Sequence, residues 1–154
     1  MSEAQLVRKF YEAFQRLDAN TMAECYHDEV EFEDPAFGQL QGERAKAMWK
    51  MLCGNAKDLE VQFEILKAGF GKAKVKWEAH YTFSQTDRKV HNIVEADLTI
   101  ENGKIIKHID HFNLRKWSIQ AMGLTGKVLG GTAFFKRKLQ QQTNRLLDKF
   151  ISRN

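Results

Sequence analysis

The sequence has few of the residues that mark several classes of protein. It contains one proline, ten glycines and two cysteines among 154 residues, too few Pro and Gly for a disordered or fibrous chain. Cys25 and Cys53 are too few and too far apart for a disulfide framework or a metal-ligating pair. No apolar run reaches the roughly eighteen residues of a membrane-spanning helix. The first ten residues, MSEAQLVRKF, lack the apolar core of a signal peptide, so we expect a cytoplasmic protein.

Motifs for metal, nucleotide or serine-hydrolase chemistry are also absent. The sequence has no Cys-x-x-Cys, His-Glu-x-x-His, Gly-x-Gly-x-x-Gly, P-loop or Gly-x-Ser-x-Gly pattern. Those chemistries depend on residues at these spacings, because the spacing sets which side chains converge on the metal, phosphate or carbonyl. We therefore expect neither a metal nor a cofactor.

The net charge of +4 is unevenly distributed along the chain. Residues 1–114 hold 15 basic and 19 acidic residues, whereas residues 115–154 hold nine basic residues and one acid, Asp148. A nucleic-acid-binding domain would not concentrate its charge in this way, so we expect no nucleic-acid partner. The basic C-terminal segment could instead contact an anionic membrane surface weakly, or pack on the domain or on a partner with its cations in water.

Hydrophobic periodicity predicts helices first and strands afterwards. Apolar residues three or four positions apart predict helices over residues 2–17, from an N-cap at Asn20 to Tyr26, and from Glu43, with Leu52 on its buried face, to a C-cap at Gly54. Alternation predicts a strand at 30–34 and four further strands between 59 and 114, joined as an antiparallel meander. A last helix begins near Thr132. Its predicted apolar stripe consists of Phe135, Leu139, Leu146 and Phe150.

These elements predict an α+β fold, with a curved antiparallel sheet wrapped around three N-terminal helices and an added amphipathic C-terminal helix. We expect residues 1–115 to form the domain and residues 116–154 to form a basic helical extension packed on it.

Three polar residues share the phase of the apolar, inward-facing positions of their strands: Asp34, His108 and Asp110. An isolated carboxylate in an apolar site is costly, and burial raises its pKa toward values useful to a general base. These residues are therefore the candidate catalytic groups, with Asp34 as the base and His108, oriented by Asp110, as the donor. Two structural alternatives remain open. Asp34 could bond backbone N–H groups in the turn at Pro35, and His108 and Asp110 could satisfy each other in the core.

Apolar and aromatic residues in the same phase are candidates for the lining of a pocket, or for an ordinary core. They are Phe10, Tyr11, Phe14, Tyr26, Trp49, Trp77, Tyr81, Phe83, Val94, Ala96, Leu98, Ile106 and Phe112. His80, His91 and His111 fall on the opposite face, where solvent or a subunit contact is expected.

Three segments carry a resemblance to a known family. Residues 10–14 (FYEAF), residues 25–35 (CYHDEVEFEDP) and residues 103–112 (GKIIKHIDHF) resemble the nuclear transport factor 2-like superfamily, in its SnoaL-like and ketosteroid isomerase-like branch. The resemblance implies a cone-shaped domain that encloses a deep apolar pocket, usually in a homodimer. It also implies that Asp34 matches the general base of the isomerase.

The sequence departs from the isomerase pattern at the two oxyanion donors. The position of the donor tyrosine falls on Phe10, with Tyr11 one residue away, and that of the protonated aspartate falls on Ala96 or Glu95. A missing oxyanion donor costs orders of magnitude in rate, so steroid isomerisation is in doubt.

Two functions are compatible with these residues. One is a cofactor-independent isomerase, cyclase or dehydratase acting on a hydrophobic carbonyl compound, polyketide-like or steroid-like, with Asp34 as the general base. The other is a noncatalytic module that binds a small hydrophobic ligand or forms a dimer.

Overall fold

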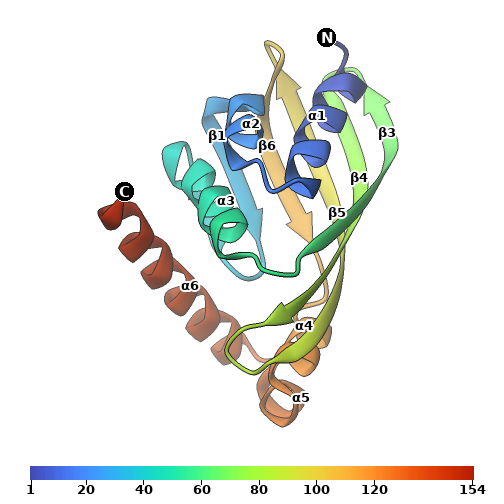
Figure 1. Cartoon of the computed structure of the whole chain (residues 1–154). Coiled ribbons are helices and arrows are strands. Elements are labelled where there is room, and N and C mark those ends of the chain that lie inside the picture. Colours follow the sequence, from blue (N-terminus) through green and yellow to red (C-terminus); the bar gives the residue numbers. More distant parts are fainter.

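A computed structural model describes all 154 residues (Figure 1). The helices are α1 (Glu3–Gln15), α2 (Ala19–Cys25), α3 (Glu43–Asn55), α4 (Leu114–Met122), α5 (Leu124–Leu129) and α6 (Ala133–Arg153). The strands are β1 (Tyr26–Asp34), β2 (Gly38–Gln41), β3 (Glu60–Gly69), β4 (Lys72–Phe83), β5 (Arg88–Glu101) and β6 (Lys104–His111). None of the helices combines the length and hydrophobicity that a bilayer crossing requires.

The six strands form one curved sheet in the order β2-β1-β6-β5-β4-β3. Neighbouring strands are antiparallel except β1 and β6, which run parallel with Phe32 opposite His108. Helices α1, α2 and α3 cover one face of the sheet, and α6 runs alongside α3 (Figure 1). The α+β fold predicted from the sequence is confirmed, with the parallel β1–β6 pair joining the first strands to the meander.

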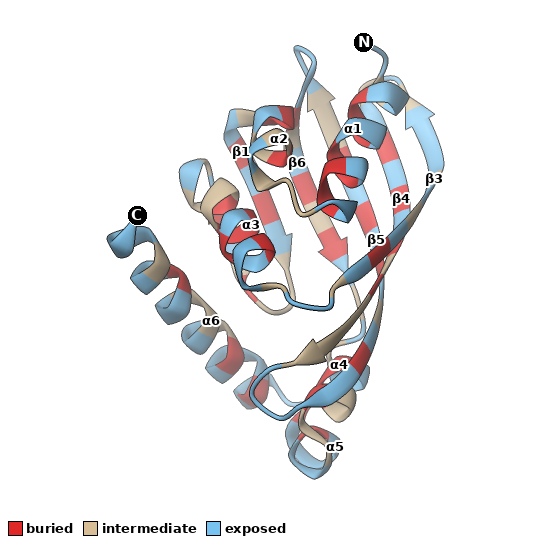
Figure 2. Ribbon diagram, in the orientation of Figure 1, coloured by how far each residue is buried: buried red, intermediate tan, exposed pale blue.

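The core lies between the sheet and the helices, as the red residues of Figure 2 show. Alternate residues of β4 and β5 point into it, because a strand turns successive side chains to opposite faces. Beyond the first three helices, the end of β4 and the start of β5 extend to α4 and to the first turns of α6. There a second, smaller cluster forms from Val90, Trp117, Ala121, Phe135 and Leu139.

The end of β6 differs from the prediction. The strand stops at His111, and Asn113 accepts a hydrogen bond from the backbone N–H of Lys116, which caps a helix where continued strand was predicted to Leu114. A register shift between β5 and β6 also places Ile105 in the core. Ile106 is only partly buried, so its assignment as an inward-facing lining residue is wrong.

Details of three helices also differ from the prediction. The cap of α2 is Asp18 and not Asn20, and Tyr26 begins β1. Leu52 of α3 is exposed, and Gly54 lies inside that helix and does not end it. In α6 the buried leucine of the adjacent pair is Leu147, whereas Leu146 is exposed. A one-residue error of this kind follows from the helical period of 3.6, which leaves two adjacent leucines on the border of one stripe.

Candidate functional site

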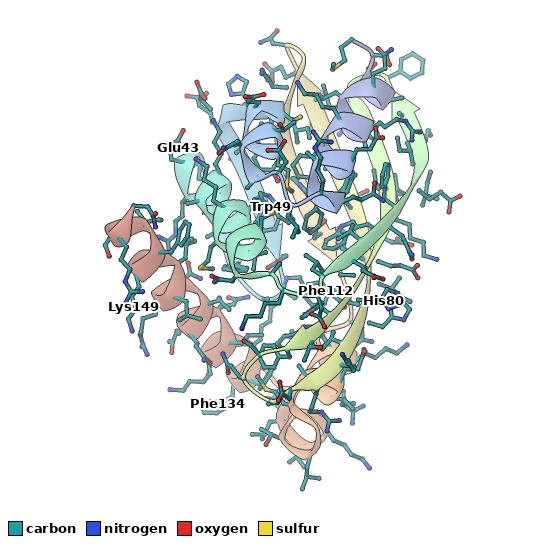
Figure 3. The ribbon with its side chains drawn as sticks, in the orientation of Figure 1. Glu43, Trp49, His80, Phe112, Phe134 and Lys149 are labelled. Carbon is teal, nitrogen blue, oxygen red and sulfur yellow. The ribbon has the colours of Figure 1, made fainter.

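The centre of the interior is a chain of hydrogen bonds through His108. The hydroxyl of Tyr26 lies 2.7 Å from His108 Nδ1, and Trp49 Nε1 donates to the same hydroxyl at 2.8 Å. On the other side of the ring, His108 Nε2 lies 2.9 Å from Asp110 Oδ1, which also accepts a bond from Trp77 Nε1 at 3.3 Å. Figure 3 shows Trp49 on α3 directed toward the sheet.

The direction of these bonds follows from the indole groups, which can only donate. The Tyr26 oxygen accepts from Trp49, so its own proton is available for His108 Nδ1. His108 Nε2 then carries the ring proton and donates to Asp110. Both nitrogens of the fully buried His108 are thus satisfied, and the ring holds the Asp110 carboxyl group in place.

Aromatic rings enclose His108 on several sides. The centroids of the rings of Phe10, Phe32 and Trp49 lie 5.6, 5.2 and 5.9 Å from that of the imidazole. These contacts exclude water from the hydrogen bonds, which strengthens them and makes any unpaired polar group in the same space costly.

Asp34 ends β1 at the edge of this interior. Its Oδ1 accepts bonds from the backbone N–H groups of Ala36 and Phe37, at 2.9 and 2.6 Å. Pro35 forces this turn, because it has no N–H with which to continue the strand ladder. These two bonds are the ones expected if Asp34 serves to stabilise the turn at Pro35. No protein group, however, donates to Oδ2, the second carboxyl oxygen.

Burial raises the pKa of Asp34 to about 7, and the charge of Asp110 adds to the shift, whereas the bonds from Phe37 and Ala36 oppose it. The two carboxyl groups act on each other because their strands are neighbours. Glu33 lies opposite Ile109 in the β1–β6 register, so one further step places Asp34 beside Asp110. The carboxyl group of Asp34 therefore titrates near neutral pH.

Tyr11 contributes the one buried side-chain polar atom that has no hydrogen-bond partner, its hydroxyl oxygen. Burial raises the pKa of Tyr11 well above its ordinary value, and the charge of Asp110 is the second cause. The ring stacks on Phe63 of β3, with centroids 5.4 Å apart. The sequence places Tyr11 among the lining residues and one position away from the donor tyrosine of the isomerase. An unpaired buried hydroxyl is a property of the packed structure that strand and helix periodicity does not reveal.

The C-terminal helix covers the turn that holds Asp34. Gln140 Nε2 donates to the Pro35 carbonyl, Thr143 Oγ1 to that of Ala36 and Asn144 Nδ2 to that of Phe37, at 2.8 to 3.1 Å. Together they bind three consecutive carbonyl groups of the turn, so α6 fixes the backbone whose N–H groups hold Asp34.

The other lining candidates fall into two groups. Most are buried in the main core: Phe10, Tyr11, Phe14, Tyr26, Trp49, Trp77, Val94, Ala96 and Leu98. Tyr81, Phe83 and Phe112 are only partly buried and contact the smaller cluster at α4, where Trp117 Nε1 donates to the Tyr81 hydroxyl at 2.7 Å. Figure 3 shows Phe112 below the end of β6, between these two groups.

Two hollows in the surface lie outside the three candidate catalytic residues, although Tyr26 lines the second of them. One, of about 340 Å³, is lined by outward side chains of β1, β2 and β6, among them Glu31, Glu33 and Lys107. The other, of about 440 Å³, lies at the start of β1, beside His27, Asp28 and Lys46. Neither includes Asp34, His108 or Asp110.

The outward-facing histidines pair with one another and with acids. The rings of His80 and His91 stack with centroids 3.9 Å apart, and His91 lies 3.4 Å from Glu78. His111 lies 3.1 Å from Asp97. No group of three or more His, Cys, Asp or Glu side chains is arranged to hold a metal ion.

Comparison with known proteins finds a family and a fold. Residues 7–108 match the family model described as SnoaL-like domain. No curated protein matches the chain in sequence.

Solved structures with the same fold share little sequence with the chain. An NTF2-like protein of unknown function from Burkholderia pseudomallei has a TM-score of 0.67 at 20% identity, over 79% of this chain and 99% of that one. A candidate polyketide cyclase from Pseudomonas putida has a TM-score of 0.66 at 19% identity, over 79% and 98%. An LEH-like epoxide hydrolase from M. tuberculosis has a TM-score of 0.61 at 18% identity, over 81% and 93%.

Proposed function

Because the chain belongs to the SnoaL-like domain family, within the NTF2-like superfamily, we propose that it binds a small hydrophobic molecule and catalyses a proton transfer on it. The substrate is a carbonyl compound, polyketide-like or steroid-like, and the reaction is of the isomerase, cyclase or dehydratase type. Structural relatives that are described as a candidate polyketide cyclase and an epoxide hydrolase support a small-molecule enzyme.

One observation carries the proposal: the carboxyl group of Asp34 has a pKa of about 7 at the edge of an aromatic interior. A general base works best when its pKa lies near the operating pH, because it is then both available and basic. With Oδ1 held by Ala36 and Phe37, Oδ2 is the atom that takes the proton from a carbon next to the substrate carbonyl. Return of that proton to another carbon completes an isomerisation.

The negative charge that develops on the carbonyl oxygen needs a hydrogen-bond donor to stabilise it. His108 does not supply it in this arrangement, because its two nitrogens are bonded to Tyr26 and Asp110. The hydroxyl of Tyr11 is unpaired and buried, so it is the group we propose as the donor. His108 then acts through Asp110, as a positioning residue.

Exchange of carbon-bound protons tests the proposal without knowledge of the natural substrate. In D₂O, NMR follows the α-protons of two probe ketones, 2-tetralone and a steroid 3-ketone. We expect catalysed exchange that rises with pH through about 7, and at least a hundredfold loss in Asp34→Asn. Glu33→Gln is the matched control, because Glu33 is the adjacent acid on the outward face and is exposed. Equal rates for wild type and Asp34→Asn would remove Asp34 from the mechanism.

A noncatalytic ligand-binding or dimerisation module is the second candidate function. It is favoured by the close packing of Phe10, Tyr26 and Trp49 around His108. It is also favoured by the hydrogen bonds from α6 to the carbonyl groups of the Asp34 turn, which we call the α6 seal. Native mass spectrometry of the purified protein distinguishes the two. A co-purified molecule that stays unchanged on incubation, with no exchange of the probe ketones, supports the noncatalytic module.

A further inference from the structure

Helix α5 and the start of α6 form one end of the molecule (Figure 1). This end carries large, exposed apolar side chains. Four of them define what we call the apolar end patch. They are Leu124, Val128, Leu129 and Phe134, with 76%, 67%, 39% and 54% of their surface exposed. Figure 3 shows Phe134 at the lower end of α6, away from the sheet.

Helix α5 is built so that its apolar side chains must face outward. The residue it turns inward is Gly126, packed so closely on α4 that an added Cβ would lie 2.0 Å from the Ser118 carbonyl oxygen. At Gly130 an added Cβ would lie 1.9 Å from Ser118 Oγ. An ordinary surface helix buries its leucines and valines. Here glycine occupies the buried side, and Leu124 and Val128 are left in solvent.

The segment that carries this patch is basic and has no acid of its own before Asp148. Residues 115–147 contain seven Lys and Arg residues and no Asp or Glu. Lys127 belongs to α5, and the ammonium group of Lys138 lies 5.7 Å from the centre of the Phe134 ring. Asp148, the acid of the C-terminal segment, is bonded to Arg44 at 2.7 Å. The adjoining β4–β5 turn adds Asp87 and Arg88, and it adds Lys89, whose ammonium group is paired with Asp58 at 3.7 Å.

We propose that the apolar end patch docks on the surface of an anionic lipid bilayer. Projecting apolar side chains enter the boundary between headgroups and acyl chains, while the surrounding Lys and Arg residues attract the acidic headgroups. A second copy of the chain is a poor partner, because it presents the same positive charge. Nucleic acid is also a poor partner, since contacts with phosphate leave no role for Leu124, Val128 and Phe134. The proposal goes beyond the proposed catalysis and does not depend on it.

Co-sedimentation with vesicles tests the proposal on the full-length protein. The vesicles are neutral phosphatidylcholine, alone or with about 30% phosphatidylglycerol, at low and physiological salt. We expect at least tenfold stronger binding to the anionic vesicles, weakened by salt. The triple variant Leu124→Ser, Val128→Ser, Phe134→Ser should lose at least tenfold of that binding. Lys127→Ser and Lys138→Ser should each lose about fivefold.

Matched controls come from the other end of the sheet. Phe70→Ser and Leu66→Ser remove exposed apolar side chains from the β3–β4 hairpin and should bind vesicles like the wild type. The melting temperatures of all variants should stay close to that of the wild type, because the substituted side chains are exposed.

Three results would overturn the proposal. They are no binding of the wild-type protein to anionic vesicles, equal binding by the triple variant, and binding to double-stranded DNA as tight as that to vesicles. In the last case, sensitivity to the lysine variants but not to the triple variant would assign the surface to polyanions in general.

Discussion

Asp34 and Asp110 each lie one residue beyond the Glu33–Ile109 pair of the parallel strands β1 and β6, and burial, with the charge of Asp110, raises the pKa of Asp34 to about 7. Two carboxyl groups in one apolar region cannot both ionise without cost, so the protonation of Asp34 is coupled to the stability of the fold.

Stability should fall as the pH rises from 5 to 8. The folded state holds the Asp34 proton more tightly than the unfolded state, whose pKa is near 3.8, so stabilisation is complete below that value and lost through about 7. In Asp34→Asn, the change in the free energy of unfolding between pH 5 and 8 should be smaller by roughly 2 to 4 kcal/mol, because one pKa unit corresponds to about 1.4 kcal/mol. Urea unfolding at pH 5, 6, 7 and 8 measures it.

The other groups with shifted pKa values titrate outside the range from pH 5 to 8. The lowered pKa values of Glu3, Asp18, Asp28 and Asp58 start from ordinary values of 4.5 or below. The raised pKa values of the two cysteines start from 9.0. Identical slopes for the wild type and Asp34→Asn between pH 5 and 8 would show that Asp34 does not titrate there.

The His108–Asp110 pair should show strong coupling in a double-mutant cycle. His108→Leu removes the donor to the Asp110 carboxyl group and the acceptor of the Tyr26 hydroxyl proton. Only the bonds from Trp77 and Trp49 remain to these two buried groups, so the variant should cost about 3 to 5 kcal/mol. Asp110→Leu removes the other partner and should also destabilise the fold. The double variant should cost at least about 1 kcal/mol less than the sum of the two single variants. Additive costs would mean that the pair contributes no interaction energy.

The alternation of side chains between the two faces of the sheet accounts for what could be predicted of this site. Because side chains alternate along a strand, the phase of Phe32 predicts an inward Asp34, and the phase of Phe112 predicts an inward His108. This alternation does not indicate which side-chain atoms form hydrogen bonds. The prediction made Asp110 the residue that orients His108 toward a substrate, whereas both nitrogens of His108 are bonded within the protein.

The parts of the fold that sequence reasoning missed depend on contacts between distant segments. The four-residue strand β2 is too short to show a period, and it forms by pairing with β1 across the turn at Pro35. Helix α4 begins where the apolar residues Phe112 and Leu114 continue the alternation of β6, so the pattern gave no sign of the change. The seal of α6 on the Asp34 turn rests on polar side chains, which hydrophobic periodicity ignores.

Two glycines should respond to alanine in opposite directions. Gly126→Ala places a Cβ against the backbone of Ser118 and should cost about 1 to 3 kcal/mol, because α4 and α5 must separate. Gly54→Ala lies inside α3 with no other atom within 4 Å of the added Cβ. It should stabilise the fold by about 0.5 to 1 kcal/mol. Thermal unfolding compares them, and a stable Gly126→Ala variant would contradict the close packing of α5 on α4.

The α6 seal should control how strongly Asp34 is buried. Thr143→Ala and Asn144→Ala each remove a bond to a carbonyl of the turn, worth about 1 kcal/mol. Asn144→Ala also removes one bond of Arg44, which stays bonded to Asp148. In the double variant, the amide protons of Ala36 and Phe37 should exchange with solvent at least tenfold faster. The pKa of Asp34 should fall toward its ordinary value as water reaches the carboxyl group.

Hydrogen exchange and a carbon-detected NMR titration of the Asp34 carboxyl group measure these two effects. Ser152→Ala is the matched control on α6, since Ser152 is exposed and bonds only to the carbonyl of Lys149, within its own helix. If the pKa of Asp34 stayed near 7 in the double variant while the amides exchanged faster, its burial would come from the interior alone. The helix would then hold the turn without setting the protonation of the carboxyl group.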